Sequence, residues 1–448
     1  MGLGRIQNSS YLTCFVVISG EAFFILLLMK QSVLQLFIPL CMFPSLIHAQ
    51  RNEVLSPEIA SLQVMADNEW TNMPIIELGG DKIINISFDE LSHTYHRYCY
   101  KIEHCEADWT TSTELFESDY ISGFASGNTV DDYAQSVGTN QLYTNYSLRF
   151  PNDKCKLRMS GNYRITVYDE DEDNRAILKA CFMVVEPRMN IKMLVSSNTD
   201  IDINSSHQQV NLSLDFGNIN VTEPNTQVKT VVMQNERWDN AVINCNPQYV
   251  KKNGLEWTHC RDLIFPAGNE YRKFETLDVT HTTMGLERVG WDGSQYQAWV
   301  WTDEPRPNYA YDEDANGAFL IRNSDNINNN TESDYVIVHF RLKTTSTTFE
   351  NRYANQPKEI FLNGKWTNNL FDSKYKMAWN EEEQLYEASI KLKQGYYNYQ
   401  YLMKQPDGTY RPVPSEGSFF QTENKYQTLV YYRGQGERTD RLVGYNHN

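Results

Sequence analysis

Apolar and polar residues alternate with a period of two along most of this chain, which is the pattern of a β-strand with one buried face. A helix would place apolar residues three and four positions apart, and no convincing amphipathic helix longer than about three turns is found. Strands are expected at 162–168, 177–185, 210–216, 335–342, 386–392 and 397–401. The fold class that follows is all-β, built of tandem β-sandwich domains.

The first fifty residues differ from the rest and contain two apolar runs, 11–29 and 33–47. Read from Met29, a charged start precedes an apolar run that ends near Ala49, which is the order of a secretory signal peptide. We therefore expect residues 1–49 to be an upstream extension plus a signal peptide, with the natural start at Met29 and cleavage after Ala49. A membrane anchor at 11–29 is the alternative, and the charge of Glu21 makes it costly.

The composition restricts the partners of the chain. Its 448 residues carry a formal net charge of −17, with 40 Lys and Arg against 57 Asp and Glu. An acidic surface repels a phosphate backbone and anionic lipid headgroups, so neither nucleic acid nor direct lipid insertion is expected. A hydrophobic share of 41% and a charged share of 22% are typical of globular domains and not of a disordered chain.

Three domains are expected after the leader. Pro187 closes the first block of strands, and the stretch 344–348, which is rich in Thr, resembles a linker. The expected domains are a β-sandwich at 51–187, a second β-sandwich at 188–345, and an immunoglobulin-like domain at 346–448 that is similar to carbohydrate-binding early-set modules.

Six cysteines remain once the leader is removed: Cys99, Cys105, Cys155, Cys181, Cys245 and Cys260. An exported protein folds where disulfides form, but the sequence does not choose among the possible pairings. A bond between Cys99 and Cys105 is disfavoured, because one strand through both would hold them ~20 Å apart. Buried thiols that act as small apolar side chains are the alternative.

No catalytic motif is found, so the chain is not expected to be an enzyme and no cofactor is expected. There is no Gly-x-Ser-x-Gly elbow, no His-Glu-x-x-His pair and no Gly-rich phosphate loop after a strand. Asp312, Asp314 and Asn316 match the first half of a calcium loop. The last ligand position is Asn323 and not Glu, so we favour a hairpin turn and expect no metal site.

Residues 104–145 combine weak periodicity with many aromatic side chains. A loop of this length is either functional or a set of short unrecognised elements. One interpretation is that the aromatics pack back onto the sandwich. The other is a protein-binding surface, because Tyr and Trp are favoured at interfaces. Its candidate residues are Trp109, Tyr120, Phe124 and Tyr133.

The C-terminal block, 359–401, resembles the carbohydrate-binding sandwiches attached to glycogen-active enzymes. The shared features are a Gly-x-Trp, a Met-x-Trp-like edge, a Tyr-Glu-Ala strand and a Gly-Tyr-Tyr-x-Tyr string. Trp366, Trp379 and Tyr397 are the candidates for a sugar-stacking platform. The alternative is that these rings fill the core of an immunoglobulin-like fold.

Several strings occur together in one order: HCEADW (104–109), DYISGF (119–124), SGNYRITVY (160–168), DEDANGAFLIRN (312–323), DYVIVHFRL (334–342) and DRLVGY (440–445). The chain resembles the Plug protein family of the Bacteroidetes type IX secretion system, and the resemblance spans nearly all of the mature chain. Asn145 departs from the family pattern, in which His is expected.

The resemblance implies a periplasmic, non-enzymatic protein on the inner side of the outer membrane. Such a protein binds the outer-membrane translocon barrel and closes its periplasmic opening when the channel is idle. It would be monomeric when free. A periplasmic or surface glycan-binding protein is the second hypothesis, a carbohydrate-active hydrolase the third, and an outer-membrane barrel is disfavoured by the polar end of the chain.

Overall fold

The structure is a computed structural model that describes residues 17–18, 21–22, 52–344 and 358–448. Two compact units are present, 1–47 and 48–448. In the first, β1 (Val17–Ile18) pairs with β2 (Glu21–Ala22). The expected signal peptide and its cleavage site lie outside the described residues. Among the described residues, no helix is long and apolar enough to span a bilayer.

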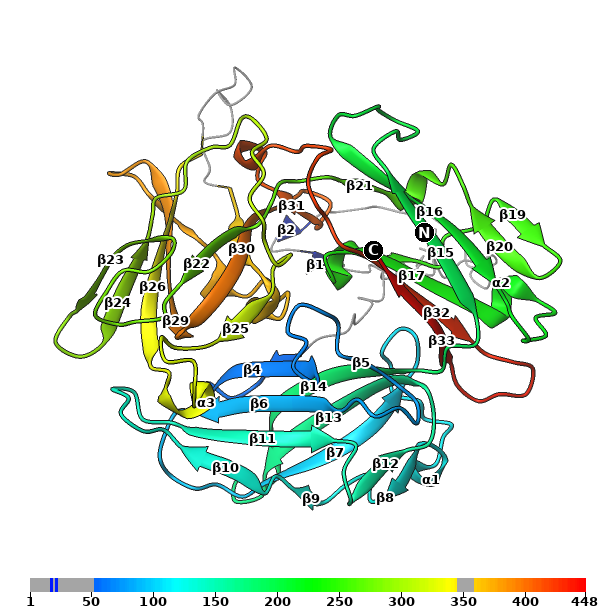
Figure 1. The fold of residues 1–448 in the computed structure, drawn as a ribbon, viewed down its shortest axis with the longest axis horizontal. Coiled ribbons are helices and arrows are strands. Elements are labelled where there is room, and N and C mark those ends of the chain that lie inside the picture. The colour runs from blue at the N-terminus through cyan, green and yellow to red at the C-terminus, as the bar shows by residue number, and fades with distance from the viewer. Residues whose placement is uncertain (1–16, 19–20, 23–51, 345–357) are drawn as a thin grey trace, which may run out of the picture. The chain divides into compact units, whose positions relative to one another are not determined.

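The second unit begins with a sandwich of two main sheets, drawn in blue to green at the bottom of Figure 1. One sheet has the order β10-β11-β6-β4, and the other has the order β3-β14-β13-β7-β9 with β5 parallel to β14. The elements are β3 (Glu53–Val54), β4 (Ile59–Ala66), β5 (Ile75–Glu77), β6 (Ile84–Glu90), β7 (Tyr98–Cys105), α1 (Glu117–Tyr120), β8 (Ile121–Gly123), β9 (Asn128–Thr129), β10 (Asp132–Gln135), β11 (Thr144–Phe150), β12 (Cys155–Leu157), β13 (Gly161–Asp169) and β14 (Arg175–Val185).

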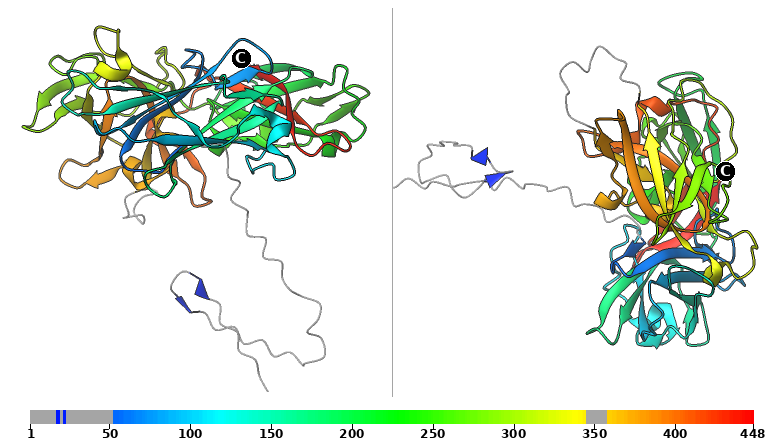
Figure 2. Two further views of the ribbon diagram at one scale, coloured as in Figure 1. Left: turned by 90° about the horizontal axis from the view of Figure 1, so that it is seen from below. Right: turned by 90° about the vertical axis from the view of Figure 1, so that its left-hand side faces the viewer.

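A second sandwich is built from two separate parts of the chain. Its sheets have the orders β15-β16-β20-β19, with β21 also on β16, and β18-β17-β32-β33. The elements are β15 (Asn190–Ser196), β16 (His207–Asp215), α2 (Pro224–Gln227), β17 (Val228–Gln234), η1 (Trp238–Asn240), β18 (Val242–Ile243), β19 (Tyr249–Lys251), β20 (Gly254–Trp257), η2 (Arg261–Leu263), β21 (Ile264–Pro266), β32 (Tyr426–Tyr432) and β33 (Arg441–His447). Of the two C-terminal strands, red in Figure 2, β32 therefore lies beside β17, and β33 lies on the other side of β32.

The third sandwich occupies the stretch of chain between β21 and β32. One sheet has the order β22-β30-β25, with β27 and β31 also on β30, and the other has the order β23-β24-β26-β29-β28. The elements are β22 (Arg272–Glu275), β23 (Leu286–Trp291), β24 (Tyr296–Val300), β25 (Phe319–Ile321), α3 (Asn329–Glu332), β26 (Tyr335–Leu342), β27 (Ile360–Asn363), η4 (Lys365–Thr367), η5 (Ser373–Tyr375), β28 (Ala378–Asn380), β29 (Leu385–Lys393), β30 (Gly395–Lys404), β31 (Tyr410–Pro412) and η6 (Pro414–Glu416).

These sheets confirm the all-β, tandem-sandwich class. The strand expected at 335–342 has those same bounds in β26. The strands expected at 162–168, 177–185, 386–392 and 397–401 lie within β13, β14, β29 and β30, and the one expected at 210–216 extends one residue past the end of β16. Each sandwich encloses its own apolar core. A fourth apolar cluster lies between the first two sandwiches and includes Met183, Met233, Trp238 and Tyr431.

The strand pairing divides the C-terminal half differently from the predicted domains. The boundary at 345 falls between β26 and β27, which belong to the same sandwich, and the stretch 345–357 lies outside the described residues. The third sandwich, near 271–413, is inserted into the second, near 190–266 and 426–447. Alternation specifies which face of a strand is buried but not which strand is its neighbour.

Candidate interaction surfaces and the junctions between sandwiches

The four residues proposed for a protein-binding surface separate into two groups. Trp109 is buried and packs edge-on against Trp238, with ring centroids 5.8 Å apart, and Tyr120 is buried in the first core. Phe124 is 73% exposed and Tyr133 is 47% exposed. Only these last two of the four have exposed rings; Phe124 directly follows β8, and Tyr133 lies in β10.

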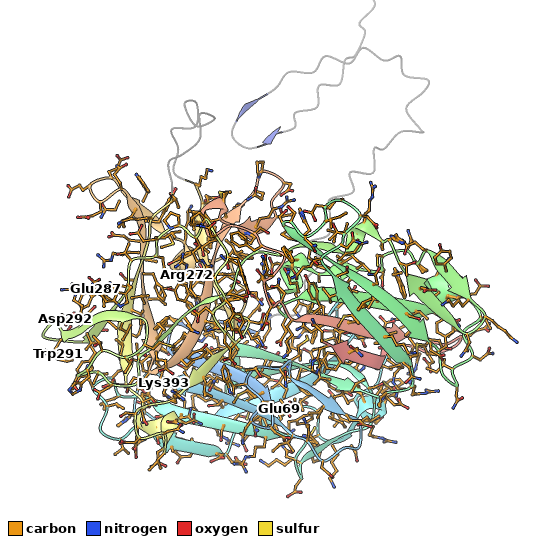
Figure 3. The ribbon with its side chains drawn as sticks, turned by 45° about the horizontal axis from the view of Figure 1, so that its top comes forward. Glu69, Arg272, Glu287, Trp291, Asp292 and Lys393 are labelled. Atoms are coloured by element: carbon orange, nitrogen blue, oxygen red, sulfur yellow. The ribbon has the colours of Figure 1, made fainter. Side chains whose placement is uncertain are left out.

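An exposed aromatic cluster on the third sandwich was missed by the sequence analysis. Trp291 and Tyr296 face each other across the β23–β24 hairpin, with ring centroids 4.9 Å apart. Trp291 is 50% exposed and Trp301 is 59% exposed. Figure 3 shows Trp291 beside Asp292 at the turn of this hairpin. The signal was available in the sequence, because four aromatics flank the Asp292-Gly293 turn within eleven residues.

The proposed sugar-stacking residues do not form one surface. Trp366 and Tyr397 are buried in the core of the third sandwich, and the Trp366 indole Nε1 donates to the Asn398 carbonyl oxygen at 2.8 Å. Trp379 is half-buried and packs against Tyr386. A stacking platform needs an open ring face, and the rings of Trp366 and Tyr397 are enclosed.

The calcium-like motif builds a turn. Asp314 Oδ1 accepts from the Asn316 backbone N–H at 2.7 Å, and its Oδ2 accepts from the Tyr271 N–H. Asp312 Oδ1 contacts the Lys273 ammonium at 2.5 Å. Within the described ranges, no three His, Cys, Asp or Glu side chains converge in a way that could hold a metal ion.

Asp314 makes the stability of the protein depend on pH. Burial raises the pKa of its carboxyl to about 7. Between pH about 4 and about 7, the folded state binds a proton that the unfolded state has released, so this carboxyl contributes less stability as the pH rises. In urea unfolding, the free energy of unfolding of Asp314→Asn should increase relative to that of the wild type as the pH rises through this range. A difference independent of pH contradicts the assignment.

An ionic network around one buried carboxylate joins the first and second sandwiches. The Asp440 carboxylate, which is 1% exposed, accepts from the Ala107 backbone N–H at 3.0 Å and from Lys229 Nζ at 2.8 Å. It also accepts from Arg433 Nε at 3.0 Å, and Arg433 contacts Glu106. The strings HCEADW and DRLVGY meet at this junction.

His104, the first residue of HCEADW, is buried in the same junction. Its Nδ1 lies 2.9 Å from Ser112 Oγ, and Ser112 Oγ lies 3.0 Å from Thr439 Oγ1. Burial lowers the pKa of His104 to about 4. The imidazole is therefore neutral at physiological pH and holds position through hydrogen bonds; it is not poised for proton transfer near neutrality.

A second buried ion pair joins the first and third sandwiches. Lys393 Nζ lies 2.6 Å from Asp89 Oδ2, and the two side chains are 1% and 0% exposed. Asp89 also accepts from the Tyr335 hydroxyl at 2.7 Å and from Asn145 Nδ2 at 2.7 Å. The Lys393 ammonium lies 4.0 Å from the ring centroid of Tyr143. Asn145, where the family pattern led us to expect His, thus donates a hydrogen bond to the carboxylate of this ion pair.

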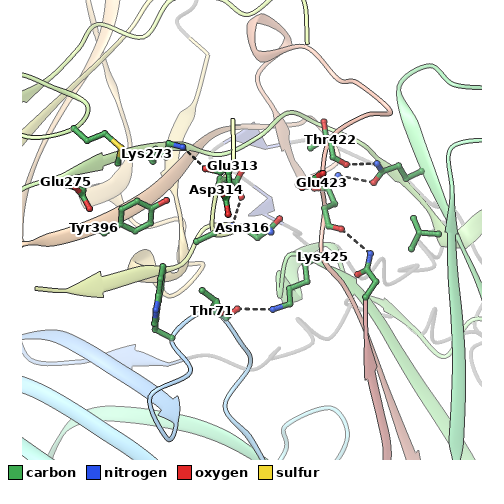
Figure 4. Close-up of a pocket in the computed structure, with 17 residues that line it drawn as sticks. Thr71, Lys273, Glu275, Glu313, Asp314, Asn316, Tyr396, Thr422, Glu423 and Lys425 are labelled. Atoms are coloured by element: carbon green, nitrogen blue, oxygen red, sulfur yellow. Dashed lines mark hydrogen bonds between the residues drawn. The ribbon is translucent and has the colours of Figure 1, made fainter. Parts of the chain in front are cut away.

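The three sandwiches meet around a cleft of about 910 Å³ (Figure 4). Lys425 Nζ from the second donates to the Thr71 carbonyl oxygen of the first at 3.2 Å. Trp70 of the first packs edge-on against Tyr396 of the third at 5.8 Å. Contacts between all three sandwiches therefore converge at one place.

The comparisons with known proteins agree with this architecture. A family model described as the first domain of the type 9 secretion system plug protein matches residues 59–186, which form the first sandwich. A solved structure, described as a hypothetical protein from Parabacteroides merdae ATCC 43184, is 43% identical with a TM-score of 0.84. It covers 89% of this chain and 99% of its own. No curated protein sequence matches significantly.

An all-β protein of three joined sandwiches is thus the class that the fold defines. The chain carries, as its first sandwich, a domain that matches the family model of the type 9 secretion system plug protein's first domain at residues 59–186. It is a type IX secretion-associated protein, and the family is not a known family of enzymes.

Proposed function

We propose that the protein is a non-enzymatic periplasmic plug, which binds the outer-membrane translocon barrel of type IX secretion and closes its periplasmic opening when the channel is idle. The match of the first sandwich to the plug protein model carries this proposal. The expected export by a signal peptide supports the location, and the acidic charge supports a protein partner over a lipid surface.

The junctions support it on physical grounds. A body that closes a wide opening must hold its shape, and burying an ion pair between sandwiches makes their separation costly, because each charge would be left unpaired. Asp440 and the Asp89–Lys393 pair provide such contacts on two sides of the first sandwich. Closing an opening requires a complementary surface and no catalytic pocket.

The proposal assigns the barrel contact to Phe124 and Tyr133 on the first sandwich. Of the four aromatics selected from the sequence, these two have exposed rings. Trp109 and Tyr120 are left out of this contact, because Trp109 lies in the cluster between the first two sandwiches and Tyr120 in the core of the first.

The test is recovery of the barrel with the tagged protein from membranes in mild detergent, together with the permeability of the outer membrane to large antibiotics. We expect the barrel to be recovered and deletion of the gene to increase permeability. Phe124→Ser with Tyr133→Ser should reduce recovery, whereas Tyr249→Ser, an exposed aromatic of the second sandwich, should not. Unchanged permeability and no recovered barrel would together refute the proposal.

A further inference from the structure

Two cysteines face each other inside the second sandwich. Cys245 and Cys260 both belong to its buried core, and their thiols lie within hydrogen-bonding reach of one another. Burial raises the pKa of Cys245, which also means that its thiolate is rare in the folded protein. The chain between them forms the β19–β20 hairpin.

The two cysteines come from opposite sheets. Cys245 follows β18. The N–H of its neighbour Asn244 donates to the Thr230 carbonyl oxygen of β17 at 2.8 Å, and the Thr230 N–H donates to Asn244 Oδ1 at 2.9 Å. Cys260 follows β20 and its carbonyl accepts from Gln209 Nε2 of β16 at 3.3 Å. A bond between the sulfurs would therefore connect the two sheets.

A buried tryptophan completes the arrangement. The Trp257 indole Nε1 donates to the Cys245 carbonyl oxygen at 2.9 Å, and the side chain lies in the same core as both thiols. In antibody domains, a buried Trp packs against a disulfide that links the two sheets. The second sandwich thus places the same three residue types together on a different strand arrangement.

We propose that Cys245 and Cys260 form an intramolecular disulfide in the mature protein, which rests on the export proposed above. One cysteine thiolate attacks a sulfur of an oxidising disulfide, such as oxidised glutathione or a dithiol oxidase, and releases one thiolate of the oxidant. The second cysteine then displaces the other thiolate. Two protons leave the cysteines, and two electrons reduce the oxidant to two thiols.

Other cysteines of the chain serve as internal controls. The Cys99 thiol donates a hydrogen bond to Glu170 Oε1 at 3.0 Å. Cys105 lies at the other end of the same strand, β7. Cys155 is buried in the core of the first sandwich. These three should remain thiols under conditions that oxidise Cys245 and Cys260.

The test uses the full chain, refolded from denaturant with oxidised glutathione, then unfolded, alkylated without reduction and digested with trypsin. Lys251 and Lys252 separate the two cysteines, so only a disulfide can join peptide 238–251 to peptide 253–261. We expect the joined pair, lighter than the sum by two hydrogen atoms, and alkylated Cys99, Cys105 and Cys155. Complete alkylation of Cys245 and Cys260 overturns the proposal.

A second measurement follows stability. A disulfide that closes a loop of this size stabilises the folded state, so a reductant should lower the melting temperature of the oxidised protein by several degrees. Cys245→Ser with Cys260→Ser should abolish this dependence, and Cys99→Ser should preserve it. Neither measurement involves the barrel, so failure here leaves the proposed function standing.

Discussion

Replacing Lys393 by methionine should lower the free energy of unfolding by about 3–5 kcal/mol. The side chain fills a similar volume, but the Asp89 carboxylate loses its partner while it remains fully buried between the first and third sandwiches. An uncompensated buried charge is costly because the surrounding protein screens it poorly. The loss is measurable by chemical unfolding.

Two controls distinguish the buried charge from a general packing defect. Asp89→Asn combined with Lys393→Met removes both charges and should recover much of the loss. Lys82→Met breaks the exposed pair with Glu69, whose side chain is 44% exposed (Figure 3), and should cost less than about 1 kcal/mol. A loss at Lys393 no larger than at Lys82 would refute the argument.

Replacing Arg272 by methionine should have a comparable or larger effect, about 3–5 kcal/mol or more. Its guanidinium lies 2.7 Å from Asp303 and 2.9 Å from Glu416, and both carboxylates are nearly buried. The Tyr399 and Tyr401 hydroxyls also donate to Asp303. Without Arg272, Asp303 loses this ion pair in an enclosed site, next to Glu416, which keeps its contact with Arg306.

The loss at Arg272 should increase with pH. Burial already raises the pKa of Asp303, and removal of the neighbouring positive charge raises it further. A carboxyl whose pKa is raised in the folded state lowers the free energy of unfolding as the pH rises above the pKa of the unfolded chain, about 4. In chemical unfolding at several pH values, the free energy of unfolding of Arg272→Met should fall further below that of the wild type as the pH rises. Arg411→Met, at an exposed pair, provides the control, and a constant difference would contradict the assignment.

The strands were predictable and their partners were not. Alternation located β26, because Val336, Val338, Phe340 and Leu342 recur at every second position and face one core. Alternation could not show that β17 pairs with β32, because many strands present equivalent backbone edges. The whole third sandwich lies between these two strands in the sequence. The predicted domain boundary at 345 therefore relied on loop composition, and composition does not report strand neighbours.

The candidate surfaces show the same difference at the level of residues. The sequence identified an aromatic-rich segment, but composition cannot tell whether a ring such as Trp109 points inward or, like Phe124, outward. The family strings, in contrast, correspond to junctions: HCEADW meets DRLVGY through Glu106 and Asp440. Residues distant in sequence are brought together there by charge pairing between sandwiches.

Because the third sandwich is inserted into the second, the order in which segments become available for folding matters. β17 is made early, and its partner β32 follows only after the whole insertion. Until then the edge of β17 is unpaired, and an unpaired edge invites aggregation. A chain that stops before β32 would present a finished first and third sandwich beside an open second one. The second sandwich can therefore close only after the whole insertion and the last two strands have been made.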